Sequence, residues 1–173
     1  MGWVFGYGSL MWRPGFRFVR AQQARLFGHH RAFCVYSHVH RGTPDMPGLV
    51  LGLDRGGSCR GMAYEIDDAD WHDVIQYLRA REQATAVYLE RELNVHLQDG
   101  KRVSATTYLV DQSHLQYAGR LSLKEQLRLV RQGVGQSGPN PDYVKNTVQH
   151  MEEMGIVDGP LHKLMHELLL KLD

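Results

Sequence analysis

The spacing of apolar residues changes once along this chain of 173 residues, and this change most constrains its fold. In the first ~115 residues, apolar and polar positions alternate between glycine-rich turns, which is the period of half-buried strands. In the last ~50 residues, apolar positions recur every three or four residues, as they do on one face of a helix. The order predicts a mixed α+β fold in which a sheet is followed by helices.

The alternating region divides into short predicted strands, and the rest into predicted helices. We expect strands at 3–5, 20–27, 31–39, 49–53, 59–66, 87–97 and 103–110. Glycine-containing turns at 54–57 and 99–100 are each expected to close a hairpin. One helix is predicted within the sheet region, from Asp67 or Asp68 to about Arg81, and three follow from Ser122, Pro141 and Asp158.

Size and charge set the class of protein. The length and the 43% share of hydrophobic residues fit one globular domain spanning residues 1–173. A net charge of +1 offers no field that would attract nucleic acid or a membrane surface, so neither partner is expected. No apolar run approaches the ~20 residues of a membrane span, and the first residues lack a signal-peptide pattern. With only two cysteines, the sequence predicts a cytoplasmic protein with reduced thiols, and it does not indicate an oligomeric state.

A glycine-rich loop follows the first predicted strand and consists of Gly6, Tyr7, Gly8, Ser9, Leu10 and Met11. It matches only the first two glycines of the dinucleotide-binding motif, and the strands that follow do not form the required βαβ unit. Amide groups bared by glycine can bind a carboxylate or an oxyanion. The alternative interpretation is a tight turn with no ligand.

Other candidate sites have weaker support. His38 and His40 lie on one face of a predicted strand with Cys34 nearby, and His162 and His166 are four residues apart, but neither pair has the further ligands that zinc requires. We therefore predict no metal site. Ser9 does not lie in a nucleophile-elbow motif, and neither cysteine has local support as a nucleophile.

Glu82 is the carboxylate best placed for acid-base chemistry. It follows the predicted helix that ends near Arg81, where the helix dipole would raise its pKa, while Arg79 and Arg81 would lower it. From the residues around it alone, a solvated charge at a helix end is the favoured interpretation, and a catalytic role for Glu82 needs further support. A large rise in pKa would require burial or an apolar wall.

Residues 4–16, Val-Phe-Gly-Tyr-Gly-Ser-Leu-Met-Trp-Arg-Pro-Gly-Phe, resemble the opening of the ChaC family of glutathione-specific γ-glutamylcyclotransferases. Further blocks similar to that family follow in the same order at 40–44 with 47–48, and then at 52–57, 59–64, 77–82 and 137–143. The resemblance implies a γ-glutamylcyclotransferase-like fold, in which a small barrel-like sheet is flanked by helices. It also implies an enzyme without a cofactor that cleaves glutathione to 5-oxoproline and Cys-Gly.

Matched by motif, the resemblance assigns residues 6–11 to holding the γ-glutamyl group and Glu82 to moving protons. Arg41 and Tyr143 are further candidates for binding the substrate, at its glycyl carboxylate or through a hydrogen bond, although both could be structural. Two alternatives stay open: an enzyme acting on other γ-glutamyl amines, and a non-catalytic binding or regulatory protein on the same fold.

Overall fold

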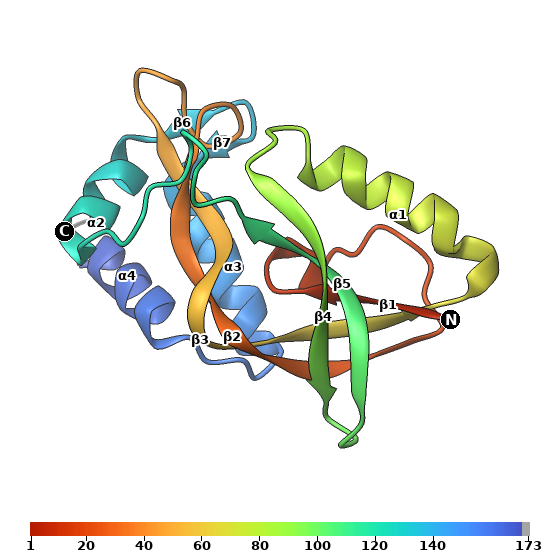
Figure 1. Ribbon diagram of the computed structural model, residues 1–173. Coiled ribbons are helices and arrows are strands. Elements are labelled where there is room, and N and C mark those ends of the chain that lie inside the picture. Colours follow the sequence, from red (N-terminus) through yellow and green to blue (C-terminus); the bar gives the residue numbers. More distant parts are fainter. Residues whose placement is uncertain (171–173) are drawn as a thin grey trace. The chain divides into compact units, whose positions relative to one another are not determined.

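The computed structural model describes residues 1–170, which divide into two compact units (Figure 1). The first unit comprises Met1–Arg31 and Leu53–Asp111, and the second comprises Ala32–Gly52 and the chain from Gln112 onward. Each unit is therefore assembled from two segments that are separated in the sequence.

Five strands form a closed barrel with the order β1-β3-β2-β4-β5. The strands are β1 (Gly2–Gly6), β2 (Arg20–Ser37), β3 (Gly48–Ile66), β4 (Tyr88–Leu97) and β5 (Arg102–Val110). Strand β1 pairs antiparallel with β3 along its whole length, from Gly2↔Ile66 to Gly6↔Met62. Its other edge meets β5 in parallel at Val4↔Thr106, which closes the barrel.

Strands β2 and β3 are long and unbroken, which corrects two sequence predictions. The pairs of strands expected at 20–27 and 31–39, and at 49–53 and 59–66, are single strands of 18 and 19 residues. The hairpin predicted at 54–57 does not form. Gly56 (φ 98°) and Gly57 (φ 67°) adopt a left-handed backbone that only glycine tolerates well, so the strand can change direction there without ending.

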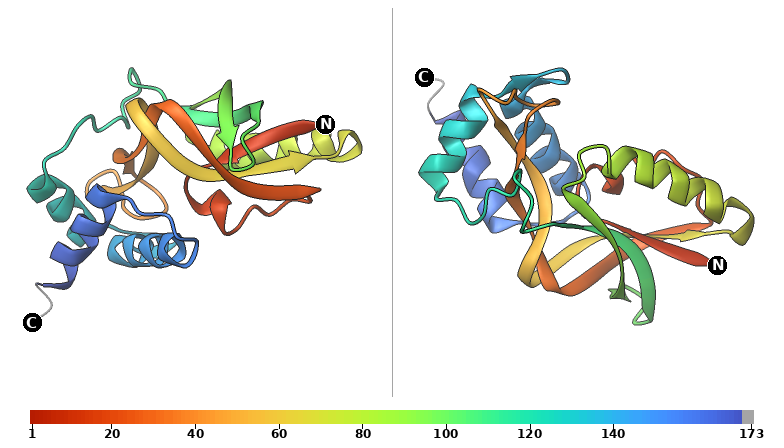
Figure 2. Two further views of the ribbon diagram at one scale, coloured as in Figure 1. Left: turned by 90° about the horizontal axis from the view of Figure 1, so that it is seen from below. Right: turned by 45° about the horizontal axis from the view of Figure 1, so that its top comes forward.

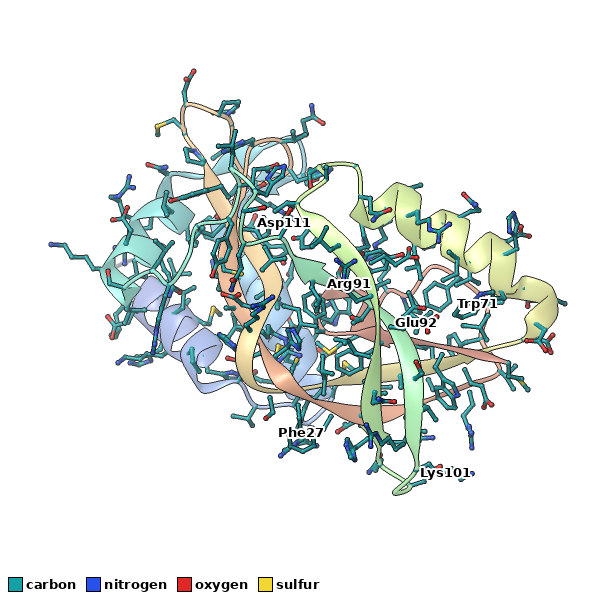
Figure 3. All side chains as sticks on the ribbon, in the orientation of Figure 1. Phe27, Trp71, Arg91, Glu92, Lys101 and Asp111 are labelled. Atoms are coloured by element: carbon teal, nitrogen blue, oxygen red, sulfur yellow. The ribbon has the colours of Figure 1, made fainter. Side chains whose placement is uncertain are left out.

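The β4–β5 hairpin agrees with the sequence prediction. Its register runs from Tyr88↔Val110 to His96↔Arg102. The turn contains Gly100, whose N–H donates to the carbonyl of Leu97, and Lys101 marks this end of the hairpin in Figure 3. The alternating pattern over 87–97 and the Asp99-Gly100 turn are enough to predict this pair. The second strand, β5, is buried on both faces from Ala105 to Tyr108.

Helix α1 (Asp68–Glu82) belongs to the first unit and is packed against the barrel. It begins as predicted, because the Asp67 side chain accepts a hydrogen bond from the N–H of Ala69 at 2.9 Å. Val74, Ile75 and Leu78 are its buried residues. They share a hydrophobic cluster with Val4, Leu10, Tyr64, Ile66 and Tyr108, so the core itself fixes the helix beside β1 and the loop after it.

The second unit contains α2 (Leu123–Gln132), α3 (Asn140–Glu153) and α4 (Gly159–Leu169), which lie side by side in both views of Figure 2. All three were expected from the sequence, and the caps of α2 and α4 at Ser122 and Asp158 are as predicted. Two short strands, β6 (Val134–Gly135) and β7 (Gly138–Pro139), were not expected, since two residues carry no periodic signal. No helix within residues 1–170 has the length and apolar character needed to cross a membrane.

Candidate active site

The glycine-rich loop leaves the end of β1 through a close backbone approach. A Cβ atom on Gly61 of β3 would lie 2.3 Å from the carbonyl oxygen of Gly6 and 2.8 Å from the Phe5 ring. Only a glycine at position 61 therefore allows the strand to pass so near. Beyond Gly6 the chain forms a single turn of 3-10 helix, Ser9–Met11, where the sequence analysis expected a loop.

The carbonyl groups of this loop are held by side chains from the barrel. The Tyr64 hydroxyl lies 2.7 Å from the carbonyl oxygen of Leu10 and 2.8 Å from that of Met11. Burial raises the pKa of Tyr64 to about 12, so the phenol stays protonated and donates. Arg31, which is also buried, donates from Nε to the carbonyl of Tyr7 at 2.5 Å. These contacts fix the backbone of the loop independently of any ligand.

The backbone N–H groups of the loop, unlike its carbonyl groups, are not all used within the described part of the protein. Within residues 1–170, the N–H groups of Gly8, Ser9 and Leu10 have no hydrogen-bond acceptor. Gly8 and Ser9 are half-buried, whereas the side chains of Tyr7, Leu10 and Met11 are buried. The loop can therefore offer backbone donors and the Ser9 hydroxyl to an anionic group, and its large side chains serve the core.

Glu82 is the last residue of α1, and its side chain is only 19% exposed. Burial raises the pKa of its carboxyl group above the ordinary value, and the positive charge of Arg81 opposes this rise. The interpretation of Glu82 as a solvated charge is therefore wrong. The cause of the raised pKa is desolvation, which the sequence analysis had named as a requirement but could not locate.

A second glutamate close by has the opposite electrostatics. Arg79 donates two hydrogen bonds to Glu90 of β4, at 2.9 and 2.8 Å, and the Tyr108 hydroxyl donates a third at 2.9 Å. The hydrogen bond from Arg79 is the largest cause of a lowered Glu90 pKa. Arg79 is thus paired with Glu90, and the expectation that it lowers the pKa of Glu82 was wrong. Of these two carboxyl groups, only Glu82 is adjusted toward proton transfer near neutral pH.

Arg81 brings Glu82 and the loop together. Its Nε lies 3.5 Å from Oε1 of Glu82, and its Nη2 donates to Oγ of Ser9 at 2.6 Å. The carboxyl group and the loop hydroxyl thus lie within the span of one guanidinium group. In the sequence, Arg81 stands out only as a charge beside Glu82, because no local pattern reveals a contact with a residue 72 positions away.

The two remaining site candidates, Arg41 and Tyr143, lie together in the second unit. The guanidinium carbon of Arg41 is 5.6 Å from the centre of the Tyr143 ring, and its Nη1 donates to the carbonyl of Pro139 at 3.1 Å. The Tyr143 hydroxyl accepts a hydrogen bond from the N–H of Leu51 at 3.2 Å. The planar guanidinium group keeps further N–H donors that could bind a carboxylate.

The histidines considered as metal ligands have other partners. The His38 ring stacks on Tyr36, and Nδ1 of His40 lies 3.0 Å from the Ser137 hydroxyl. In the part of the chain that the structure describes, no three His, Cys, Asp or Glu side chains come together as a ligand set. Both cysteines, Cys34 and Cys59, are buried.

Solved structures match this architecture. The crystal structure of a γ-glutamyl cyclotransferase specific to glutathione from yeast superimposes with a TM-score of 0.85, at 24% identity, over 96% of this chain and 95% of that one. The chain therefore has the γ-glutamylcyclotransferase fold. The five-stranded barrel and its flanking helices place the chain in this fold class.

Sequence comparison then gives the family. The profile of the ChaC-like proteins matches residues 2–170. The glutathione-specific γ-glutamylcyclotransferase of Escherichia coli K12 is 33% identical over 163 residues, which cover 94% of this chain and 71% of that protein. Glutathione-specific γ-glutamylcyclotransferase 1 of Homo sapiens is 29% identical over 157 residues, covering 88% and 71% respectively. The chain belongs to the ChaC family.

Proposed function

We propose that this protein is a glutathione-specific γ-glutamylcyclotransferase, which releases 5-oxoproline and Cys-Gly from glutathione. The similarity to relatives named for this activity supports the proposal. The observation that carries it is the Glu82 carboxyl group, whose pKa is raised by burial and which Arg81 links to Ser9 of the anion-binding loop.

The reaction needs one group that moves protons. The Glu82 carboxylate takes a proton from the α-ammonium group of the substrate, and the freed amine attacks the γ-carbonyl carbon. As the bond to the cysteinyl nitrogen breaks, the Glu82 carboxylic acid gives its proton to that nitrogen. The restored Glu82 carboxylate then takes the second surplus proton from the ring nitrogen and passes it to the released amine, so that 5-oxoproline leaves with one N–H and Cys-Gly leaves as an ammonium group. Both the nucleophile and the leaving group belong to the substrate, so this mechanism uses neither an enzyme nucleophile nor a cofactor.

The loop at residues 6–11 positions the γ-glutamyl group in this proposal. The free N–H groups of Gly8, Ser9 and Leu10 bind the α-carboxylate of the substrate or the oxyanion of the tetrahedral intermediate. Holding the amine and the carbonyl carbon in line is worth an effective molarity of roughly 10⁵–10⁸ M in a favourable intramolecular reaction. Much of the rate enhancement thus comes from the rigid loop.

The proposal assigns the glycyl carboxylate of glutathione to Arg41, with Tyr143 holding the guanidinium group by its ring. We expect Arg41→Ala to raise KM for glutathione about tenfold or more, because a charge-assisted hydrogen bond contributes roughly 1.5–3 kcal/mol. Glutathione glycinamide, which lacks this carboxylate, serves as the control substrate. An equal loss for both substrates would argue against the assignment.

The experiment that tests the function is product analysis with the variant Glu82→Gln. Wild-type protein incubated with glutathione should release 5-oxoproline and Cys-Gly, detected by mass spectrometry. The isosteric variant should keep the fold and lose about 10²- to 10⁴-fold in kcat, the range typical of general acid-base catalysis. Glu92→Gln is the matched control, because Glu92 is exposed on β4 and labelled in Figure 3, and it should leave turnover unchanged. Wild-type turnover in Glu82→Gln would end the assignment.

The protein as a whole is proposed to be one domain over residues 1–173 that acts in the cytoplasm. The family profile spans residues 2–170 without interruption, which supports a single functional unit. The cytoplasmic location is proposed from the low cysteine count, since two cysteines are too few for a disulfide framework.

A further inference from the structure

The Arg81 side chain contacts several groups besides the carboxyl group of its neighbour Glu82. Besides Glu82 and Ser9, its Nη1 lies 2.9 Å from the carbonyl oxygen of Arg13 and 3.2 Å from the Tyr77 hydroxyl. Only 22% of the side chain is exposed. The guanidinium group therefore joins the last turn of α1 to both ends of the loop segment 9–13.

We propose that Arg81 is a positioning residue of the γ-glutamyl site, which holds the Ser9 hydroxyl and the Glu82 carboxyl group in a fixed relation. This inference rests on the proposed function, and it adds a role that neither the mechanism nor the anion-binding loop supplies. Arg81 itself transfers no proton and forms no bond to the substrate.

The first part of this role concerns the direction of the Ser9 hydroxyl. Oγ of Ser9 accepts the Nη2–H group of Arg81 at 2.6 Å, a short, charge-assisted hydrogen bond. A hydroxyl that accepts from one side keeps its own hydrogen for another acceptor. Arg81 thus turns Ser9 into a donor, which suits a carboxylate or a developing oxyanion placed against the loop.

The second part concerns the charge state of Glu82. Arg81 on α1 and Tyr108 on β5 are the titratable groups whose electrostatic interactions reach Glu82. Tyr108 donates its hydrogen bond to Glu90, whose charge is in turn paired with Arg79. Arg81 is the cation that limits the rise in the Glu82 pKa. Without it, a smaller fraction of Glu82 would be ionised and able to accept the substrate's proton at neutral pH.

Lysine cannot replace these contacts. The guanidinium group presents its donors as a rigid planar fork, so one side chain reaches Glu82, Ser9 and Arg13 at once. An ammonium group is a compact point charge on a flexible stem. Arg81→Lys should therefore keep part of the electrostatic effect on Glu82 and lose the orientation of Ser9.

The test compares Arg81→Met, Arg81→Lys and Ser9→Ala through the pH dependence of kcat/KM for glutathione. We expect Arg81→Met to lower kcat/KM about 10- to 100-fold and to move the acidic limb to higher pH. In Arg81→Lys, the acidic limb should lie close to its wild-type pH while KM stays raised. In Ser9→Ala, KM should rise and the acidic limb should stay at its wild-type pH. The control is Arg128→Met, since Arg128 pairs with Glu125 on the surface of α2 and should behave as wild type.

A second readout does not depend on turnover. Titration of the Glu82 carboxyl carbon by ¹³C NMR in the free protein should give a higher pKa in Arg81→Met than in wild type. An unchanged pKa and an unchanged acidic limb, with only a lower Tm, would overturn the inference and leave Arg81 a structural residue. Failure of the proposed function is a different outcome, because wild-type protein would then release no 5-oxoproline. If Arg81→Met does not fold, Arg81→Lys tests the inference. A raised KM with the acidic limb near its wild-type pH would support the positioning role, and an unchanged KM would overturn it.

Discussion

The carboxyl group of Glu82 destabilises the folded protein at neutral pH, because burial disfavours its charged form. A pKa above the unfolded value means that the folded state binds this proton more tightly than the unfolded state does. The cost is fully present above the folded pKa and disappears as the pH falls below the unfolded value. We therefore expect Glu82→Gln to raise Tm at pH 7–8, by about 2–4 °C for each kcal/mol of this cost.

The sign of this effect is testable against Glu90, which differs in its partners. Hydrogen bonding to Arg79 lowers the pKa of Glu90, so its charge stabilises the folded state above the unfolded pKa. Glu90→Gln should lower Tm at neutral pH, in contrast to Glu82→Gln, and both differences should shrink toward pH 3–4. Thermal melts of both variants across pH provide the measurement, and a lower Tm for Glu82→Gln at pH 8 would contradict the assignment of burial as the cause.

These two glutamates mark the limit of sequence reasoning at the scale of the residue. The resemblance to the ChaC family identified Glu82, because the residue ends a block, 77–82, that is similar to that family. The motif could not tell that Arg79 turns to Glu90 while Arg81 turns to Ser9. Such partners depend on which strand lies beside the helix, and that is a property of the tertiary structure.

At the scale of the element, Gly61 of β3 leaves no room for a side chain beside the end of β1, where the loop begins. A methyl group there would meet the carbonyl oxygen of Gly6 at 2.3 Å and the Phe5 ring at 2.8 Å. We expect Gly61→Ala to cost about 1–3 kcal/mol, as overpacked sites do, and to raise KM because the loop must move. Urea denaturation and steady-state kinetics measure the two effects.

Gly159 provides the matched control for this substitution. It stands at the start of α4, and a Cβ atom added there would have no neighbour within 4 Å. Gly159→Ala should leave activity unchanged and stability equal or slightly higher, because alanine restricts the unfolded chain more than glycine does. A Gly61→Ala variant as stable and active as Gly159→Ala would show that the loop does not depend on β3.

Elements were predictable where the signal is local. The caps at Asp67, Ser122 and Asp158 gave the starts of three helices, because each cap needs only a side chain and the next turn of backbone. The breaks expected in β2 and β3 were wrong for the same reason. Glycines at 28 and 56–57 indicate a turn locally, but β2 and β3 continue through these positions, and each of these strands lies between two neighbours in the barrel.

At the scale of the whole molecule, the division into two units could not be predicted from the sequence. The boundaries fall at Arg31, Gly52 and Asp111, the first two within continuous strands. No change of composition, linker or charge run marks them. A unit assembled from separated segments is defined by contacts between distant residues, and periodicity describes only neighbours along the chain.

The same chain path predicts that the molecule unfolds in a single step. Strands β2 and β3 pass from one unit into the other without a break, so melting either unit removes ordered ends from strands of the other. The chain carries separate probes for the two units.

All three tryptophans, Trp3, Trp12 and Trp71, lie in the first unit. Helices α2, α3 and α4 lie in the second unit and supply most of the helix in residues 1–170. Tryptophan fluorescence and circular dichroism at 222 nm should therefore give coincident urea transitions, and Gly61→Ala should shift both midpoints equally. Separate midpoints, or a shift confined to fluorescence, would mean that the units fold independently and that residues 1–173 are two domains.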